Sequence, residues 1–211
     1  MSQKGGVGKS ALARSAAVAL AAKGRRVLLA DFDENQATCL RWRAQRKLRK
    51  LKPKISAGAY SRFGKLSREE GRYDDIVMDS PGRLNKKCIE LARVADAIFL
   101  PTSFSLDDLV PTLRVVEVLH EHFVPSDNIA VVFCRTGASR PQEAQARAIL
   151  KINGLTTLNA ALPQKDGYAP LFATGRTGRE SPNPFLRNAA LRLDEEIIAF
   201  IDRATYAHRA A

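Results

Sequence analysis

Residues Lys4 to Ser10 read Lys-Gly-Gly-Val-Gly-Lys-Ser (KGGVGKS), and these seven residues are the strongest indication of the fold. Closely spaced glycines allow successive backbone N–H groups to turn inward and surround the oxygens of a phosphate. A helix that begins near Lys9 would add the positive end of its dipole to the same site. Glycines that lead into Gly-Lys-Ser are typical of a phosphate-binding loop, in which Lys9 reaches the β- and γ-phosphates and the Ser10 hydroxyl ligates Mg²⁺.

Outward from this loop, short apolar runs alternate with longer amphipathic stretches. The apolar runs predict buried strands at 27–30, 76–78, 97–100 and 129–133, with a weaker strand within 155–162. The stretches between them predict helices over 9–23, 37–50, 84–95, 106–122 and 141–152, and a last helix over 185–206. Ser105 and Ser139 are candidate helix caps. This alternation predicts a three-layer α/β fold, with a mostly parallel, twisted sheet, helices on both faces, and a single domain over residues 1–211.

The strand that should precede the phosphate loop is almost missing, because only Met1, Ser2 and Gln3 come before Lys4. A strand at that place would lie in the middle of the sheet, and without it the neighbouring strands lose backbone pairing and burial. We therefore expect the first strand to be truncated, and a chain extended upstream by about ten residues to be more stable.

The composition indicates a folded protein of a reducing compartment. Hydrophobic residues make up 45% of the 211 residues, enough for a core, and no apolar run approaches the roughly 20 residues that span a bilayer. The three cysteines, Cys39, Cys88 and Cys134, are far apart, so a disulfide framework or a zinc site is not expected.

Positive charge is concentrated in one part of the chain. The formal net charge is +12, and residues 35–68 contain eleven Lys and Arg but no Asp or Glu. The segment 41–54 is either the solvated face of a helix that buries Trp42, Leu48 and Leu51, or a contact for a polyanion such as DNA. A second group of arginines lies near the C-terminus. The candidate DNA contacts are Arg46, Lys47 and Lys50 from the first group and Arg176 and Arg179 from the second.

Three further stretches follow the loop in order: VLLADFDENQ at 27–36, YDDIVMDSP at 73–81 and ADAIFLPTSFSLDDL at 95–109. Together with the loop they resemble the ParA/MinD family of deviant Walker A P-loop ATPases, whose mark is an extra lysine at the start of the loop, here Lys4. The resemblance is strong from Gln3 to Leu109 and fainter beyond. It is closest to short plasmid-type ParA partition proteins.

The resemblance implies roles for particular residues. Asp33 would orient the attacking water, Asp31 would support the metal shell, and Asp79 would hold Mg²⁺ through water. Lys4 would contact phosphate across a dimer interface, as an arginine finger does. The implied cofactor-binding residues are Gly5, Gly6, Val7, Gly8, Lys9, Ser10, Ala11 and Pro163.

The chain departs from the family pattern at three places. Glu34 replaces the proline that usually follows Asp33, and Ala11 replaces a second hydroxyl residue after Ser10. Cys134-Arg135 stands where the family often has Asn-Arg, so recognition of adenine from this strand is not expected.

The implied function is a weak Mg-dependent ATPase for DNA partitioning, with ATP and Mg²⁺ as cofactors. It would dimerise with ATP, bind DNA non-specifically, and release it after hydrolysis stimulated by a ParB-type adaptor. It would be cytoplasmic and nucleoid-associated, without a membrane partner. One alternative is a MinD-like membrane-cycling regulator, but the acidic polar face of the last helix does not suit an anionic bilayer. The other is a metabolic amide ligase of this fold, for which no convergent polar cluster is evident.

Overall fold

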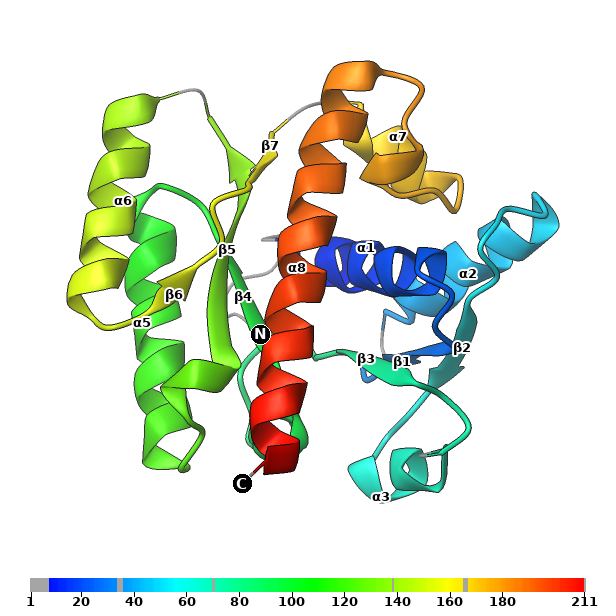
Figure 1. Cartoon of the computed structure of the whole chain (residues 1–211), viewed down its shortest axis with the longest axis horizontal. Helices are drawn as coiled ribbons and strands as arrows, with labels where there is room; N and C mark the ends of the chain where they lie inside the picture. The colour runs from blue at the N-terminus through cyan, green and yellow to red at the C-terminus, as the bar shows by residue number, and fades with distance from the viewer. Residues whose placement is uncertain (1–7, 34–35, 70, 138, 165–166, 211) are drawn as a thin grey trace. The chain divides into compact units, whose positions relative to one another are not determined.

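The computed structural model describes residues 8–33, 36–69, 71–137, 139–164 and 167–210, with side chains to residue 207. The chain divides into two compact units (Figure 1). The unit named here the β1–β3 unit comprises residues 10–81 and 165–194, and the β4–β5 unit comprises residues 1–9, 82–164 and 195–211. The units are described separately below, and the single domain predicted over residues 1–211 stays a prediction.

The β1–β3 unit contains a parallel three-stranded sheet in the order β2-β1-β3. Its strands are β1 (Val27–Asp31), β2 (Ser56–Ala59) and β3 (Asp75–Asp79). Every residue of β1 is buried, because this apolar strand is the central one of the three. In the register of the sheet Asp31 lies opposite Asp79, so both strands present a carboxylate at the same edge.

Two helices flank this sheet, namely α1 (Lys9–Ala22) and α2 (Thr38–Leu48). The buried residues of α1 are mostly small and apolar, which permits close packing over the second half of the helix. Helix α2 packs against β1 and β2. The shorter elements of the unit are α3 (Phe63–Leu66) and α7 (Tyr168–Ala173), with 3₁₀ turns at Ser67–Glu69 and Gly178–Glu180.

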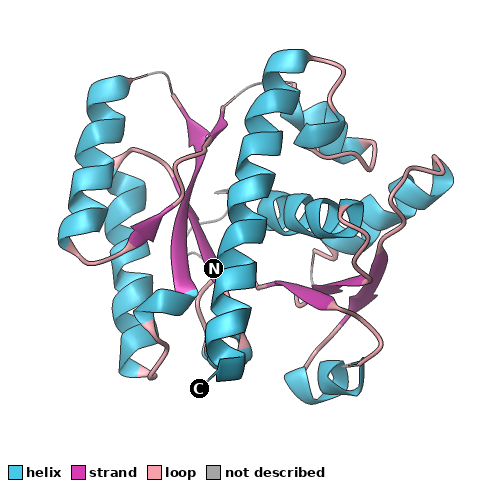
Figure 2. Cartoon of the chain, viewed as in Figure 1, coloured by secondary structure: helices cyan, strands magenta, loops and turns pink. Residues whose placement is uncertain are grey.

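The β4–β5 unit contains a second parallel sheet in the order β4-β5-β6, and β7 also pairs with β5 (Figure 2). Its strands are β4 (Ile98–Thr102), β5 (Ile129–Thr136), β6 (Thr156–Thr157) and β7 (Leu162–Pro163). Its helices are α4 (Lys86–Val94), α5 (Leu106–Glu121) and α6 (Arg140–Ile152), with a 3₁₀ turn at Ser126–Asn128. Residues 129, 131 and 133 of β5 pack in one apolar cluster with side chains of α5 and α6.

Helix α8 (Pro184–Ala210) contributes residues to both units. Its second half packs in the β4–β5 unit, where the Phe200 ring lies 5.4 Å from the Phe99 ring. In the same unit the Glu196 carboxylate accepts the backbone N–H groups of Asn159 and Ala160, at 2.6 and 2.9 Å. Of the helices in the described ranges, none is long and apolar enough to cross a membrane.

The predicted α/β fold with parallel strands and flanking helices is confirmed. The predicted helices and strands occur within about four residues of their expected bounds, and Ser105 and Ser139 cap α5 and α6 through the N–H groups of Asp107 and Gln142. The segment 155–162 forms two very short strands instead of one, and β2, α3 and α7 were not predicted. The prediction of a truncated first strand concerns residues that lie outside the described ranges, so it stays a prediction.

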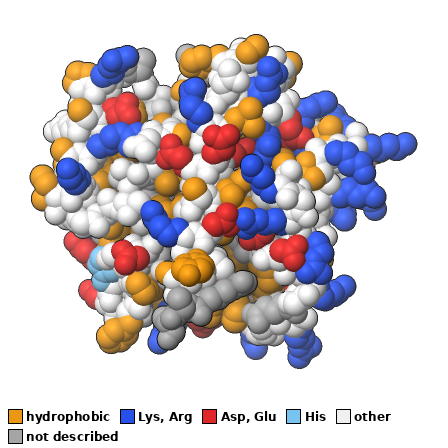
Figure 3. All heavy atoms as spheres, viewed as in Figure 1, with side chains coloured by type: hydrophobic (Ala, Val, Ile, Leu, Met, Phe, Trp, Pro, Cys, Tyr) orange, Lys and Arg blue, Asp and Glu red, His pale blue; other side chains and the backbone are white. Residues whose placement is uncertain are grey.

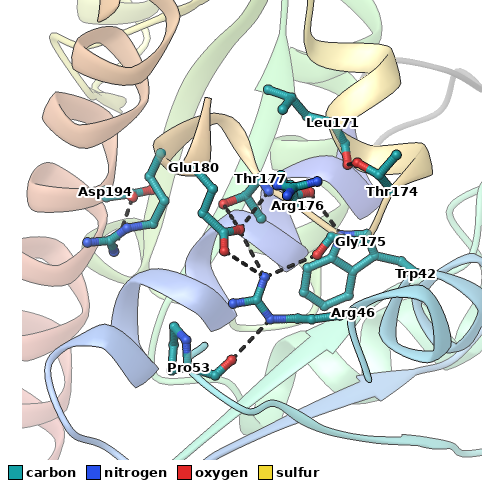
Figure 4. Close-up of polar contacts among 11 residues, drawn as sticks. Trp42, Arg46, Pro53, Leu171, Thr174, Gly175, Arg176, Thr177, Glu180 and Asp194 are labelled. Atoms are coloured by element: carbon teal, nitrogen blue, oxygen red, sulfur yellow. Dashed lines mark hydrogen bonds and ion pairs between the residues drawn. The ribbon is translucent and has the colours of Figure 1, made fainter. Parts of the chain in front are cut away.

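Arg46 was one of the candidate DNA contacts, but the structure buries it. Its side chain is only 2% exposed, and its Nη1 group donates to both carboxylate oxygens of Glu180 at 2.9 Å (Figure 4). Arg46 also donates to the carbonyl oxygens of Gly175 and Pro53, each at 3.1 Å. The guanidinium carbon lies 5.6 Å from the centroid of the Trp42 ring. Arg46 therefore joins α2 to the segment 175–180.

Helical spacing explains this outcome. Trp42 and Arg46 are four residues apart, so they share the buried face of α2. Leu48, which was expected to be buried with Trp42, lies on the other face and is 73% exposed. Gly175 completes the contact, because its φ of 77° and its place against the Arg46 backbone leave no room for a Cβ.

We expect Glu180→Ala to lower the free energy of unfolding by about 3 kcal/mol, because it leaves the Arg46 guanidinium buried without its anion. Urea denaturation of the parent and the variant measures the difference. Arg49→Ala is the control, since Arg49 is exposed and its guanidinium donates to the Gln45 side chain one turn earlier, so the loss should be within about 0.5 kcal/mol. Equal losses for the two variants would contradict the prediction.

Candidate functional site

The end of the glycine-rich loop lies in the β4–β5 unit. Gly8 has a φ of 106°, which glycine adopts easily, and a Cβ at this position would stand 3.4 Å from the Cβ of Cys134. Lys9 begins α1, and its Nζ group donates to the carbonyl oxygen of Gly82 at 3.3 Å. The other loop residues with predicted roles, Lys4, Gly5, Gly6 and Val7, lie outside the described residues.

The hydroxyl of Ser10 lies in the β1–β3 unit beside the start of α2. Thr38, the first residue of α2, donates from Oγ1 to the Ser10 Oγ at 3.3 Å. The next residue, Cys39, contacts both strand-end carboxylates. Its backbone N–H donates to Asp31 at 2.9 Å, and its Sγ lies 3.1 Å from Oδ2 of Asp79. The first turn of α2 therefore brings together three of the predicted metal-site residues, namely Ser10, Asp31 and Asp79.

Asp31 has a structural task that the sequence did not reveal. Its two oxygens accept the backbone N–H groups of Asp33 and Cys39, at 3.1 and 2.9 Å. The residue before α2, Ala37, is left-handed and provides no side-chain cap, so the Asp31 carboxylate caps this helix from the end of β1. Burial raises the pKa of Asp31, as does the nearby Asp79, whereas the bonds from the backbone lower it.

Asp79 has one oxygen free for a ligand. Its side chain is 2% exposed, and Oδ1 has no hydrogen-bond partner among the described residues. A buried carboxylate oxygen without a partner is costly, so this oxygen suits a cation or a bound water. In the described part of the chain no three His, Cys, Asp or Glu side chains form a metal-binding group. Mg²⁺ fits such a sparse donor set, since it usually keeps several waters and takes only one or two carboxylates together with phosphate oxygens.

The remaining predicted residues are placed as follows. Asp33 is half-buried, and its carboxylate accepts the N–H of Gln36 at 3.2 Å. Ala11 is half-buried in the first turn of α1, and Pro163 lies in β7 opposite Thr136 of β5. The contacts of Thr38 and Cys39 were not predicted. Their only signal in the sequence is their place at the start of the helix that follows Asp33.

The basic residues of the β1–β3 unit divide into an exposed and an engaged group. Lys47 and Lys50 are exposed, as predicted. Arg179 forms an ion pair with Asp194 at 3.4 Å, and Arg176 is half-buried. We define the basic surface as the exposed cations of α2 and the following loop: Arg41, Lys47, Arg49, Lys50, Lys52 and Lys54. Blue side chains gather over this part of the chain at the right of Figure 3.

The two groups of cations that the sequence offered as alternatives belong to one region of the structure. Trp42 of α2 donates from its indole Nε1 to the carbonyl oxygen of Arg176 at 3.0 Å. Together with the bonds of Arg46 to Gly175 and Glu180, this contact holds the segment 175–180 beside α2 (Figure 4). Arg176 therefore lies next to the helix that carries the basic surface.

A Gly-Lys-Ser segment that opens a helix, with aspartates at the ends of two adjacent parallel strands, defines an α/β nucleotide-binding domain of the P-loop class. Residues 1–177 match the CbiA family model, described as the CobQ/CobB/MinD/ParA nucleotide binding domain. The chain belongs to this family, and the resemblance identified from the sequence is confirmed.

Curated relatives match nearly the whole chain. The protein named Maintenance of carboxysome distribution protein A, from Gloeobacter kilaueensis, is 29% identical over 204 residues, which cover 92% of this chain and 91% of the relative. The Chromosome-partitioning ATPase Soj of Thermus thermophilus is 26% identical over 240 aligned positions, covering 96% of this chain and 95% of the relative.

Solved structures show the same fold at lower identity. The septum site-determining protein MinD complexed with Mg-ADP, from Pyrococcus horikoshii OT3, matches with a TM-score of 0.73 and 20% identity over 93% of each chain. The ATP complex of a Cyanothece McdA variant matches with a TM-score of 0.71 and 16% identity over 94% of each chain.

The cysteines offer a direct test of burial within each of the two units. Cys39, Cys88 and Cys134 are buried and free, and burial raises the pKa of each thiol, to about 12 for Cys134. Because the thiolate is the reactive form, we expect a thiol reagent such as DTNB to label the native protein slowly at pH 8. All three cysteines should react at once after unfolding in guanidinium. Rapid native labelling that mass spectrometry assigns to Cys39 or Cys134 would contradict the burial.

Proposed function

We propose that this chain is an ATP-dependent partitioning ATPase that dimerises with Mg-ATP and binds DNA non-specifically. Hydrolysis, stimulated by a ParB-type adaptor, then releases the DNA. The observation that carries the proposal is the combination of two features in α2 and the loop after it: the first turn of α2 contacts Ser10 and Asp79, and the basic surface extends along the helix into that loop. Family membership supports the nucleotide half of the proposal, and the relative named as a chromosome-partitioning ATPase supports the DNA half.

In this proposal Lys9 contacts the β- and γ-phosphates, and the backbone of Gly5, Gly6, Val7 and Gly8 surrounds their oxygens. Ser10 and Asp79 hold Mg²⁺, which supplies positive charge beside the phosphates when it is bound. Asp33 orients the attacking water, and Lys4 of one subunit neutralises charge at the nucleotide of the other. We assign Asp31 to positioning rather than to the metal shell, because both of its oxygens accept backbone N–H groups.

The basic surface would contact DNA through the phosphate backbone, without reading bases. We leave Arg46 and Arg179 out of this contact, since Arg46 is buried on Glu180 and Arg179 is paired with Asp194. Lys47, Lys50 and their exposed neighbours remain, with Arg176 beside them. Dimerisation would double this surface, and avidity would then couple the nucleotide state to DNA affinity. Such a protein would be nucleoid-associated in the cytoplasm.

The contacts of α8 support DNA, rather than a membrane, as the surface to which the ATPase binds. The Glu196 carboxylate accepts two backbone N–H groups and the Phe200 side chain is buried, so this part of α8 is engaged within the β4–β5 unit. A membrane-binding helix needs an unoccupied apolar face flanked by cations.

We expect Lys9→Ala to lose ATP binding, because the positive charge at the β- and γ-phosphates is removed. Asp33→Ala should still bind ATP and lose hydrolysis, and Lys4→Ala should bind ATP and hydrolyse it slowly. A fluorescent ATP analogue measures binding, and phosphate release measures turnover. Glu117→Ala, an exposed position of α5, is the control. Hydrolysis at the parent rate by the Asp33 variant would refute the assignment of the water-orienting residue.

Dimerisation can be measured separately from ATP binding and hydrolysis. We expect the mass obtained by light scattering to double with ATP in the Asp33→Ala variant, which retains its nucleotide, and to stay monomeric with ADP or without nucleotide. A mass that does not change with nucleotide would remove the dimer from the mechanism.

Binding to DNA should fall linearly with salt on a log–log plot, with a slope of about −0.9 for each phosphate contact. We expect Lys47→Glu with Lys50→Glu to weaken binding and flatten this slope, whereas Arg114→Glu on exposed α5 should change neither. Arg147 is unsuitable as a control, because it donates to the carbonyl oxygens of Leu158 and Asn159. If ATP-bound protein ignores DNA at low salt, the partition proposal fails.

A further inference from the structure

The thiol of Cys39 stands at the carboxylate that the proposed function assigns to Mg²⁺. Its Sγ lies 3.1 Å from Oδ2 of Asp79, and the Cys39 side chain is fully buried. The other Asp79 oxygen, Oδ1, is buried without a partner among the described residues. The two oxygens of one carboxylate therefore differ sharply, since one contacts sulfur and the other is free for a ligand.

The Cys39 side chain is 0% exposed, so water does not compete with Asp79 for its thiol. The neutral thiol is a donor, and the only acceptor that faces it closely in the described residues is the Asp79 carboxylate. The S–H group therefore points at Oδ2.

Cys39 itself is fixed by the backbone. Its N–H donates to Oδ2 of Asp31 at 2.9 Å, and Asp31 lies opposite Asp79 in adjacent strands of the sheet. The position of the sulfur is thus set by the end of β1 and the start of α2. Neither Asp31 nor Cys39 can move far without breaking their buried hydrogen bond, which would leave a polar atom unsatisfied.

We propose that Cys39 is a positioning residue for the metal site: its thiol holds Oδ2 of Asp79, so that Oδ1 is presented to Mg²⁺ or to a water of its shell. The proposal rests on the proposed Mg-ATP function. The hydrogen bond restricts rotation of the carboxylate about its Cβ–Cγ bond, which lowers the entropy lost when the cation binds. Partners of this kind around a metal-binding carboxylate change metal affinity by about 10- to 100-fold when they are removed.

The hydroxyl of Thr38 supports this assignment from the neighbouring position, because it donates to Ser10, the other proposed Mg²⁺ ligand. Thr38 and Cys39, at the start of α2, thus contact the two residues proposed to bind Mg²⁺. The family resemblance assigned catalytic roles to the acidic residues before this helix, and it assigned none to Thr38 or Cys39.

The test compares Cys39→Ala, which removes the donor, with Cys39→Ser, which replaces the thiol donor by a hydroxyl donor. Cys88→Ala is the matched control, because Cys88 is also a buried thiol, bonded to the carbonyl oxygen of Arg83 instead of a carboxylate. For each variant, a non-hydrolysable ATP analogue is titrated with Mg²⁺, and binding of Mn²⁺ is followed by electron paramagnetic resonance. Analogue binding in EDTA shows whether the phosphate loop still binds nucleotide without metal. The thermal melt shows whether each variant is folded.

We expect Cys39→Ala to raise the Mg²⁺ concentration for half-maximal analogue binding by about 10-fold and to weaken Mn²⁺ binding similarly, with binding in EDTA unchanged. Cys39→Ser should restore both to within about threefold of the parent, and Cys88→Ala should match the parent. A folded Cys39→Ala protein with the Mg²⁺ dependence of the parent would overturn the proposal, as would a serine variant as weak as the alanine variant. If the parent itself binds the analogue without regard to Mg²⁺, the proposed function fails, and this inference fails with it.

Discussion

The buried carboxylate of Asp31 ties the end of strand β1 to the start of helix α2, and the proposed site depends on this tie. One oxygen receives the Asp33 N–H and the other receives the Cys39 N–H, so the turn after β1 and the first turn of α2 share one anchor. Cys39 is thereby placed against Asp79, and Thr38 against Ser10. Asp31 can therefore be required for the proposed site without binding the metal, because it determines the positions of Cys39 and Thr38.

Helix α2 separates its charges by face. Arg46 and Trp42 are turned inward, where Glu180 neutralises the guanidinium, and the carbonyl oxygens of Gly175 and Pro53 accept hydrogen bonds from its Nη1 and Nε. The lysines that follow are left on the outside together with Leu48. A buried arginine needs these partners, since an unpaired charge in the interior costs several kcal/mol. The cations without internal partners are the ones that can meet an external polyanion.

The proposed coupling of nucleotide state to DNA affinity needs a physical connection between the two sites. Helix α2 contacts Ser10 and Asp79 through its first turn, and the basic surface extends along this helix into the loop that follows it. The contacts of α2 with Ser10 and Asp79 both lie within the β1–β3 unit.

The class of fold, the predicted phosphate loop and the order of the longer helices and strands follow from the sequence alone, whereas β2, α3 and α7 do not. These features follow from local chemistry, such as glycines before Gly-Lys-Ser, apolar runs of strand length, and serines placed to cap helices. Only the tertiary structure decided that Arg46 is buried, that Asp31 caps α2, and that Cys39 meets Asp79. The reason is the distance along the chain: Arg46 and Glu180 are 134 residues apart and Cys39 and Asp79 are 40 apart, so no local pattern could reveal these partners. A cation in an acid-free segment looks the same in the sequence whether its anion lies in solvent, on DNA, or on a distant turn of the same chain.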